Sequence, residues 1–139
     1  MSIRITTDKD AIDIDRLMAW LQDSYWAAGR PEDVVRRAIA ASRCFSASVD
    51  GEFAGFARVV TDGATFAWVC DVIVDPQRRG AGIGKALMAA IMDHPEFQGI
   101  RMVLATRDAH ELYRKYGFQE LGFPQNWMAI GFRTCETPD

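Results

Sequence analysis

The sequence predicts an α/β fold: a mixed central β-sheet with helices on both faces, its elements in the order β-α-α-β-β-β-α-β-α-β. Three observations support this class. Segments with apolar residues at helical spacing alternate with short segments typical of strands. An Asp50-Gly51 dipeptide, typical of a hairpin turn, separates two of the short segments. An apolar strand, a helix and a second strand follow one another from residue 66 to 106, which predicts a right-handed parallel crossover.

The first third of the chain predicts one strand and two helices. Residues 2–6 alternate polar and apolar side chains, as a half-buried strand does. The next apolar residues fall at i, i+3, i+4 and i+7, which places them on one helical face: Ile14, Leu17, Met18 and Leu21. After a loop at 24–30, Pro31 precedes two acids. A second helix should begin there, because proline needs no N–H partner and carboxylates favour the positive end of the helix dipole.

The middle third predicts the hairpin and the crossover. Two short strands should occupy residues 44–60. The strand at 66–74 is almost continuously apolar, which predicts a central strand covered on both faces. Residues 80–93 show helical periodicity, and residues 102–105 form the next apolar strand.

The last third predicts a short helix and a final strand. Asp108 with Glu111 three residues later is a variant of the capping box, and Gly117 fits the left-handed position after a helix. The helix should therefore run from Asp108 to Gly117. Residues 126–130 are mostly apolar and predict a last strand.

Length and composition exclude several classes of protein. The 139 residues predict one domain spanning residues 1–139. A net charge of −3 argues against a nucleic-acid partner. No apolar run is long enough for a membrane span and no signal sequence is recognised, so we expect a cytoplasmic protein without a membrane partner. Cys44, Cys70 and Cys135 are widely spaced, which predicts free thiols and no metal site.

The segment Gln77-Arg78-Arg79-Gly80-Ala81-Gly82-Ile83-Gly84-Lys85 carries the strongest functional signal. A glycine-rich turn that leads into a helix presents unpaired N–H groups, and the helix dipole and three cationic side chains add positive charge. A phosphate or pyrophosphate is the ligand this predicts. The alternative is a tight turn with solvated arginines. The glycine spacing is neither that of a P-loop nor that of a Rossmann dinucleotide site.

Two motifs resemble those of the GCN5-related N-acetyltransferase (GNAT) family. Residues 77–82 are similar to the family's Q/R-x-x-G-x-G/A motif, and they follow a V-x-V-x-P strand end at 72–76. Downstream, Ala109-x-x-Leu112-Tyr113-x-x-Tyr116-Gly117-Phe118 resembles the family's A-x-x-L-Y-x-x-x-G-F helix. The resemblance covers residues 66–118 and implies an acyl-CoA N-acyltransferase-like fold with acetyl-CoA as co-substrate and no metal.

The resemblance also implies which residues hold acetyl-CoA. The pantetheine arm would run along the main chain of Val72, Ile73 and Val74 like an added strand. The pyrophosphate would lie on the N–H groups of seven consecutive residues: Arg79, Gly80, Ala81, Gly82, Ile83, Gly84 and Lys85. Many members bond the pantetheine through an asparagine at the end of the following strand. Here the stretch is Thr106-Arg107-Asp108, so Thr106 or Asp108 would have to substitute.

Two catalytic residues are implied. Tyr113 matches the family's tyrosine that protonates the departing CoA thiolate; a tyrosine packed only by its ring is the alternative, and Tyr116 is a competitor one turn away. Asp71 is the single acid in an apolar strand. In one interpretation Asp71 accepts the proton of the attacking amine. In the other it is a structural carboxylate that is bonded to backbone N–H groups or to a basic residue such as Arg58.

The acceptor is expected to be a small molecule or an amino-acid-like compound with a primary amine. Acidic groups that would attract a polyamine or a lysine-rich tail are not clustered. The acceptor region should be framed by Tyr25, Trp26 and Trp68, with Arg30, Phe45 and Trp127 in the same region. Two alternatives stay open: a catalytically silent acetyl-CoA-binding regulatory module, and a protein or peptide lysine acetyltransferase. A homodimer is also possible, with the last apolar strand exchanged or paired between subunits.

Overall fold

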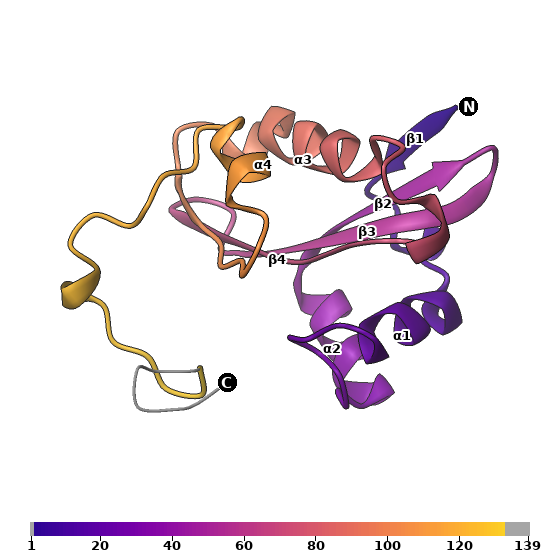
Figure 1. Ribbon diagram of the computed structural model, residues 1–139, viewed down its shortest axis with the longest axis horizontal. Helices are drawn as coiled ribbons and strands as arrows, with labels where there is room; N and C mark the ends of the chain where they lie inside the picture. Colours follow the sequence, from indigo (N-terminus) through magenta and orange to yellow (C-terminus); the bar gives the residue numbers. More distant parts are fainter. Residues whose placement is uncertain (1, 133–139) are drawn as a thin grey trace.

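The computed structural model describes residues 2–132, and in them a five-stranded sheet separates two pairs of helices (Figure 1). The strands are β1 (Ile3–Thr6), β2 (Arg43–Val49), β3 (Glu52–Thr61), β4 (Phe66–Val74) and β5 (Arg101–Val103). The helices are α1 (Ile14–Gln22), α2 (Glu32–Ala41), α3 (Ile83–Asp93) and α4 (His110–Arg114). Short 3-10 turns lie at Lys9–Ala11, Pro76–Arg78, Pro95–Phe97 and Pro124–Asn126.

The sheet is mixed, as the sequence predicts. Its strands lie in the order β1-β2-β3-β4-β5; successive strands are antiparallel up to β4, and β5 runs parallel to β4. Helix α3 makes the parallel crossover. Helices α1 and α2 cover one face of the sheet, and α3 and α4 lie on the other (Figure 1). The predicted class is confirmed, and no helix within the described residues is long and apolar enough to cross a bilayer.

The predicted hairpin joins β2 to β3. Asp50 and Gly51 both have positive φ, 50° and 86°, which is the backbone of a type I′ turn. Asparagine, aspartate and glycine tolerate this region best, and the turn's twist matches that of the flanking strands.

A core of buried apolar side chains lies on each face of the sheet. On the α3 face the largest fully buried members are Phe45, Ile83, Leu87, Met88 and Ile91. Gly55 of β3 is required there, because a Cβ at this position would lie 2.8 Å from Ile83 Cγ2. A second cluster joins α1 and α2 to the opposite face through Leu17, Trp20, Leu21, Val35, Ile39 and Phe56.

Strand β4 differs from the prediction of a central strand covered on both faces. It lies between β3 and β5, next to the edge of the sheet, and alternate side chains are only partly buried. An apolar run can predict a strand, but the order of strands in the sheet depends on long-range pairing.

Two helix boundaries differ from the sequence prediction. Helix α3 begins at Ile83 instead of Gly80, because Gly80 and Gly82 both take left-handed φ values. Helix α4 begins at His110, and Asp108 does not cap it; Thr106 Oγ1 accepts the N–H of Ala109 at 3.0 Å instead. Gly117 has the predicted positive φ, 96°, just after the helix.

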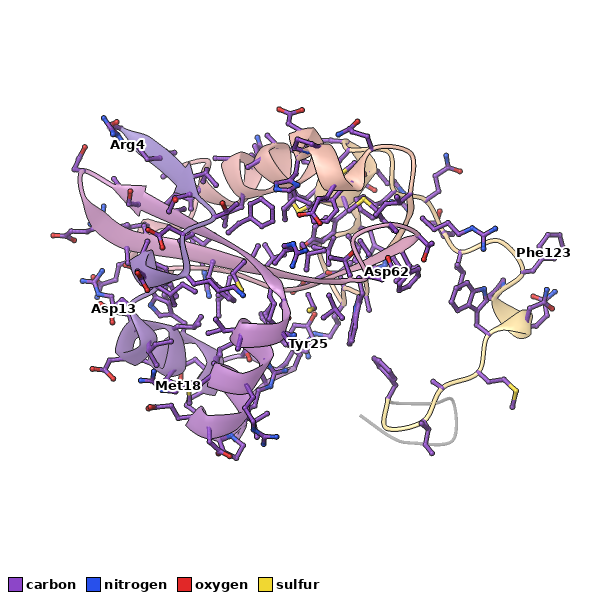
Figure 2. The ribbon with its side chains drawn as sticks, turned by 180° about the vertical axis from the view of Figure 1, so that it is seen from behind. Arg4, Asp13, Met18, Tyr25, Asp62 and Phe123 are labelled. Carbon is purple, nitrogen blue, oxygen red and sulfur yellow. The ribbon has the colours of Figure 1, made fainter. Side chains whose placement is uncertain are left out.

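The predicted strand at residues 126–130 is wrong. Residues 119–132, here called the C-terminal arm, contain a short 3-10 turn and no strand, and they extend away from the sheet (Figures 1 and 2). Met128 is 97% exposed and Ile130 is 94% exposed. Apolar composition alone does not make a strand, which needs a partner to complete its hydrogen bonds.

Candidate functional site

Strand β4 has a β-bulge at Asp71 and, beyond Trp68, an edge that is not paired with β5. Asp71 and Val72 together oppose the single residue Ala57 of β3, and Asp71 has a φ of 52°, a conformation rare for a residue with a side chain. The parallel pairing with β5 ends at Trp68 and Val103, although β4 continues to Val74. The main chain of Val72, Ile73 and Val74 is therefore not paired with β5, and it offers donors and acceptors to an extended ligand.

The glycine-rich turn lies directly after this edge. Gly80 and Gly82 have φ values of 82° and 87°, and a Cβ on either would meet nothing within 4 Å. The first N–H groups of α3, from Ile83 onward, have no partner inside the helix. Glycine therefore keeps the space in front of the helix open, as an anion seat requires.

The cationic side chains of this turn have different partners. Arg79 and Lys85 are exposed beside the turn, whereas Ala81 and Gly84 are partly buried in it. Arg78 points elsewhere, since its Nη2 donates to Glu52 Oε2 at 2.8 Å. Two of the three cations that the sequence places here thus remain available to an anion.

The two tyrosines of the α4 region have different partners. The Tyr116 hydroxyl donates to the carbonyl oxygen of Lys85 at 3.0 Å, which ties the α4 region to α3. The Tyr113 hydroxyl has no hydrogen bond to any described residue, and its ring packs edge-on against Phe118. Burial raises the pKa of Tyr113 above its ordinary value, and the nearby Tyr25 and Asp108 add to the effect. Tyr113 is thus a protonated phenol with a free hydroxyl.

The stretch after β5 carries no asparagine, and the two expected substitutes, Thr106 and Asp108, lie in different environments. The Thr106 oxygen is turned back onto the main chain, where it accepts from Asp108 N at 3.4 Å and Ala109 N at 3.0 Å. Asp108 itself is exposed. Of the two expected substitutes, Thr106 is therefore bonded to the local main chain, whereas the Asp108 side chain is exposed.

Asp71 is buried among basic and indole donors. Its Oδ2 accepts from Arg58 Nε at 2.9 Å and from Arg30 Nη1 at 2.8 Å, and its Oδ1 accepts from Trp26 Nε1 at 2.9 Å. Arg58 also donates to Ser42 Oγ at 3.1 Å. The predicted contact with Arg58 is present, while Arg30 and Trp26 join from the loop between α1 and α2.

This environment keeps Asp71 ionised. Burial alone would raise its pKa, but the attraction and hydrogen bonds of Arg58, and then of Arg30, outweigh burial and hold the pKa below its usual value. Both carboxylate oxygens also accept hydrogen bonds from guanidinium and indole N–H groups, which can donate a hydrogen bond but cannot take up a proton. The arrangement favours a structural carboxylate over one that collects a proton from a substrate.

The aromatic residues expected at the acceptor site lie on the same face of the sheet as Asp71. The rings of Tyr25 and Trp26 pack edge to face with centroids 5.0 Å apart, and Tyr25 is labelled in Figure 2. The Tyr25 hydroxyl accepts the N–H of Arg107 at 3.1 Å, and the Arg107 guanidinium lies 3.9 Å from the Tyr25 ring centroid. The loop before α2 therefore touches the loop after β5.

Three further aromatics of the expected acceptor region lie in different environments. Trp68 is partly buried on β4, and its ring centroid lies 5.6 Å from that of Phe132 in the C-terminal arm. Phe45 is a core residue that is 1% exposed, so it does not reach the site. Trp127 is exposed on the arm.

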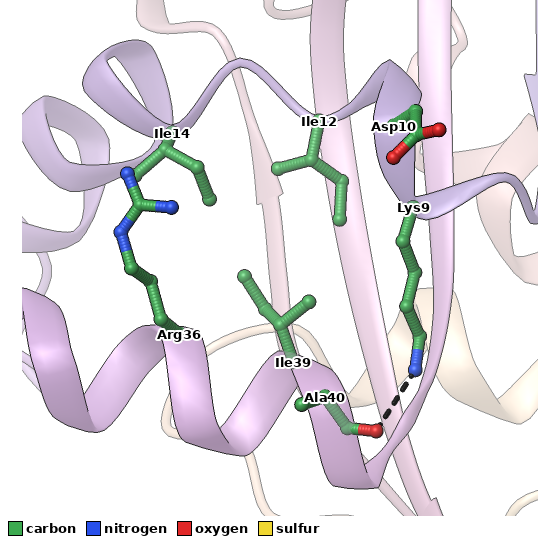
Figure 3. Close-up of a pocket in the computed structure, with 7 residues that line it drawn as sticks. All are labelled: Lys9, Asp10, Ile12, Ile14, Arg36, Ile39 and Ala40. Carbon is green, nitrogen blue, oxygen red and sulfur yellow. Dashed lines mark hydrogen bonds between the residues drawn. The ribbon is translucent and has the colours of Figure 1, made fainter.

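A separate hollow lies away from these residues. It measures about 390 Å³ and lies between the first 3-10 turn and α2, where Lys9 Nζ donates to the carbonyl oxygen of Ala40 at 3.1 Å (Figure 3). It is lined by Lys9, Asp10, Ile12, Ile14, Arg36, Ile39 and Ala40. None of the residues singled out from the sequence for function lines this hollow.

The cysteines are free thiols where the structure describes them. Burial raises the pKa of Cys44 and of Cys70 to about 11, so neither is a thiolate near neutral pH. Cys135 lies outside the described residues.

Two contacts of the site cannot be predicted from the sequence: that of Arg30 with Asp71 and that of Arg107 with Tyr25. A lone acid in a strand signals that a basic partner exists, but Arg30 lies 41 positions away in a loop with no regular pattern. The stacking of Arg107 on Tyr25 joins residues 82 positions apart. Local spacing carries no information about either pair.

Comparison with known proteins agrees with this geometry. The family described as acetyltransferase (GNAT) domain matches residues 40–120. A Gibberella zeae protein named as a candidate acetyltransferase is 27% identical over 135 residues, which cover 80% of this chain and 75% of that protein. The chloroplastic GCN5-related N-acetyltransferase 1 of Arabidopsis thaliana is 35% identical over 65 residues, covering 45% of this chain and 33% of its own length. A crystal structure of a candidate GNAT-family acetyltransferase from Xanthomonas campestris aligns with a TM-score of 0.91 and 46% identity, covering 95% of this chain and 94% of the other.

Proposed function

Because the chain belongs to the GNAT acetyltransferase family and is therefore an acyltransferase, we propose that it moves an acetyl group from acetyl-CoA directly to the primary amine of a small molecule or amino-acid-like acceptor. One observation supports this most strongly. The unpaired edge of β4 leads straight into the open glycine turn of α3, and the free hydroxyl of Tyr113 belongs to α4 on the α3 side of the sheet.

The residues around β4 and α3 fit acetyl-CoA. The main chain of Val72, Ile73 and Val74 would pair with the pantetheine amides, since β5 leaves that edge free. The N–H groups from Arg79 to Lys85 would hold the pyrophosphate, and the exposed Arg79 and Lys85 side chains would add charge. The space in front of Gly80 and Gly82 supports this placement.

Tyr113 is proposed as the general acid. Acetyl-CoA supplies an acetyl thioester, and an amine that attacks its carbonyl carbon displaces the thiol. The Tyr113 hydroxyl would donate its proton to the departing sulfur, which its raised pKa supports because the phenol stays protonated at neutral pH. Tyr116 is unsuited to this role, since its hydroxyl is bound to the Lys85 carbonyl.

Asp71 is proposed as a positioning residue. Its bonds to Arg30 and Trp26 attach the loop between α1 and α2 to the bulge of β4, and its lowered pKa makes it a poor base. The attacking amine would then lose its proton to water or to a group other than Asp71. Tyr25, Trp26 and Trp68 are proposed to border the acceptor, and Tyr25 and Trp26 depend on this loop.

The C-terminal arm supports a homodimer. Large apolar side chains on the arm are exposed, and among residues 2–132 no strand pairs with the outer edge of β5. A second copy of the chain would bury the arm and remove this apolar surface from water. We further infer one domain over residues 1–139 and a cytoplasmic location, which the free thiols of Cys44 and Cys70 support.

A thiol-release assay tests the proposed function. Acetyl-CoA is incubated with the protein and with amines, amino acids, aminoglycosides or lysine peptides, and mass spectrometry identifies the product. Release with small amines and acetylation of their amino group is the expected result. Acetylation of lysine peptides alone would establish the protein-acetyltransferase alternative. Tight CoA binding without turnover on any acceptor would establish the silent binding module.

A further inference from the structure

Two arginines share one carboxylate oxygen at the bulge of β4. Arg30 Nη1 and Arg58 Nε both donate to Oδ2 of Asp71, at 2.8 and 2.9 Å. Within residues 2–132, no other carboxylate forms an ion pair with either guanidinium. The cluster therefore carries one positive charge that no described acidic side chain balances.

Arg30 is the accessible end of this cluster. The side chains of Asp71 and Arg58 are 4% and 13% exposed, whereas that of Arg30 is 24% exposed. Among the described residues, the Arg30 guanidinium bonds only to Asp71, so several of its five N–H donors remain available. Excess positive charge that is partly removed from water is stabilised by an anion, and a guanidinium binds carboxylate or phosphate oxygens in pairs.

Arg107 adds a second cation to the same surface. It is exposed, its guanidinium lies over the Tyr25 ring, and in the described part of the chain no carboxylate pairs with it. Tyr25 packs against Trp26, and Trp26 bonds Asp71, which also holds Arg30. A continuous series of contacts thus joins Arg107 to Arg30 across a floor of two exposed aromatic rings.

A negative charge lies at the end of this surface that is nearer to Tyr113. Asp108 is exposed and lies just before α4, the helix that carries Tyr113, and its negative charge helps to raise the pKa of Tyr113. The surface is therefore cationic at Arg30 and Arg107 and anionic beside the proposed proton donor. An acceptor with an ammonium group at one end and an acidic group at the other matches this distribution.

We propose that the acceptor is an amine that also carries an anionic group, a carboxylate or a phosphate, and that Arg30 and Arg107 bind this group. The amine end would then face Asp108 and Tyr113. This inference rests on the proposed function, and it narrows the acceptor class to zwitterionic small molecules. Polyamines and other amines without an anionic group would be poor acceptors.

Matched acceptor pairs test the inference. Thiol release is measured with amino acids and their carboxamides, with 2-aminoethyl phosphate and 2-aminoethanol, and with a polyamine. For at least one of the two kinds of pair, we expect kcat/KM to be at least about tenfold higher for the member that carries the anionic group, because this group can accept charge-assisted hydrogen bonds from the arginines. The pair with the larger difference is called the preferred pair. The preferred pair distinguishes a carboxylate from a phosphate.

Variants locate the effect. Arg107→Gln lies outside the buried cluster and should fold normally, and it should reduce the preference for the anionic member to about threefold or less while the KM for acetyl-CoA stays unchanged. Arg30→Lys keeps the charge but not the paired donors, and it should raise the KM for the anionic acceptor. Arg37→Gln is the matched control, because this arginine is exposed on α2 and pairs with Asp33.

The outcomes separate the two proposals. Equal kcat/KM values within each pair, or a polyamine as the best acceptor, would overturn this inference and leave the acetyltransferase proposal standing. So would a preference that neither Arg107→Gln nor Arg30→Lys changes. No thiol release with any amine would overturn the proposed function and this inference with it.

Discussion

Asp71 and Arg58 form a buried ion pair across neighbouring strands, with Arg58 Nε 2.9 Å from Asp71 Oδ2. The pair lies at the bulge of β4, just beyond Trp68, where the pairing of β4 with β5 ends. Asp71 therefore directly precedes the unpaired segment Val72–Val74 that is proposed to bind the pantetheine arm of acetyl-CoA.

Replacing Asp71 should mainly cost stability. Asp71→Asn leaves two guanidiniums without their counter-charge, so the free energy of unfolding should fall by about 3 kcal/mol at pH 7. Because the native pKa of Asp71 lies below its unfolded value of about 3.9, this contribution is present above pH 4 and lost as pH falls through the native pKa. Urea unfolding of both proteins from pH 7 to pH 3 should show the difference shrinking at the acidic end.

A surface carboxylate provides the control for that measurement. Asp33→Asn removes an exposed pair with Arg37 and should change stability by less than about 0.5 kcal/mol. An Asp71→Asn protein of unchanged stability with a displaced pH–rate profile would instead identify Asp71 as a proton acceptor.

Removing the Tyr113 hydroxyl should slow the chemistry. Tyr113→Phe is expected to lower kcat by about 100-fold or more, with little change in acetyl-CoA affinity, because the departing thiolate loses its proton donor. In the native protein the raised pKa of Tyr113 keeps this acid protonated through neutral and mildly alkaline pH. Steady-state kinetics from pH 6 to pH 10 measure both effects.

Tyr116→Phe is the matched control for this variant. It removes the bond to the Lys85 carbonyl and should cost about 1 kcal/mol of stability while kcat changes little. If Tyr116→Phe abolished kcat and Tyr113→Phe did not, the two roles would have to be exchanged.

A charge in the glycine turn should prevent binding of CoA. Gly82→Asp places a carboxylate where the pyrophosphate is proposed to lie, so calorimetry should detect no CoA binding. Gly99→Asp is the control, since Gly99 also has a positive φ and open space at its Cβ but lies before β5, outside the turn. Normal CoA affinity in Gly82→Asp would mean that the pyrophosphate does not bind at residues 79–85.

A methyl group at Gly55 should destabilise the fold. Its Cβ would lie 2.8 Å from Ile83 Cγ2, and relieving this overlap should cost about 1–3 kcal/mol in chemical denaturation. Gly84→Ala offers a comparison, because its Cβ would be 3.8 Å from Val74 Cγ2 and alanine favours the helix. Equal stability of Gly55→Ala and the native protein would mean that α3 shifts freely on the sheet.

Polar substitutions in the C-terminal arm should disrupt the proposed dimer. Met128→Ser with Ile130→Ser removes two of the most exposed apolar side chains, and light scattering should then report a monomer where the native chain is a dimer. Val60→Thr, an exposed position on β3, should leave the assembly unchanged. A native chain that is monomeric at micromolar concentration would contradict the dimer.

The elements that the sequence predicts well are those with local causes. The hairpin at Asp50-Gly51 depends on the φ preferences of two adjacent residues, and the helices α1 and α2 depend on the spacing of apolar side chains. The glycine turn and Tyr113 are recognisable because their motifs are contiguous. The prediction of a strand at 126–130 rests on apolar content alone, which carries no information about the long-range pairing that a strand requires.

Local sequence is sufficient to predict the mixed α/β class, the glycine-rich turn before α3 and the presence of a tyrosine in α4, since each follows from residues close together in the chain. The folded chain is needed to show that the Tyr116 hydroxyl bonds the Lys85 carbonyl while that of Tyr113 bonds no described residue. It is also needed to show that Asp71 is bonded by Arg58, Arg30 and Trp26, and that Arg107 stacks on Tyr25. These relationships join residues between 13 and 82 positions apart. They depend on which faces of the sheet the helices cover and where β4 separates from β5, and no local pattern encodes either.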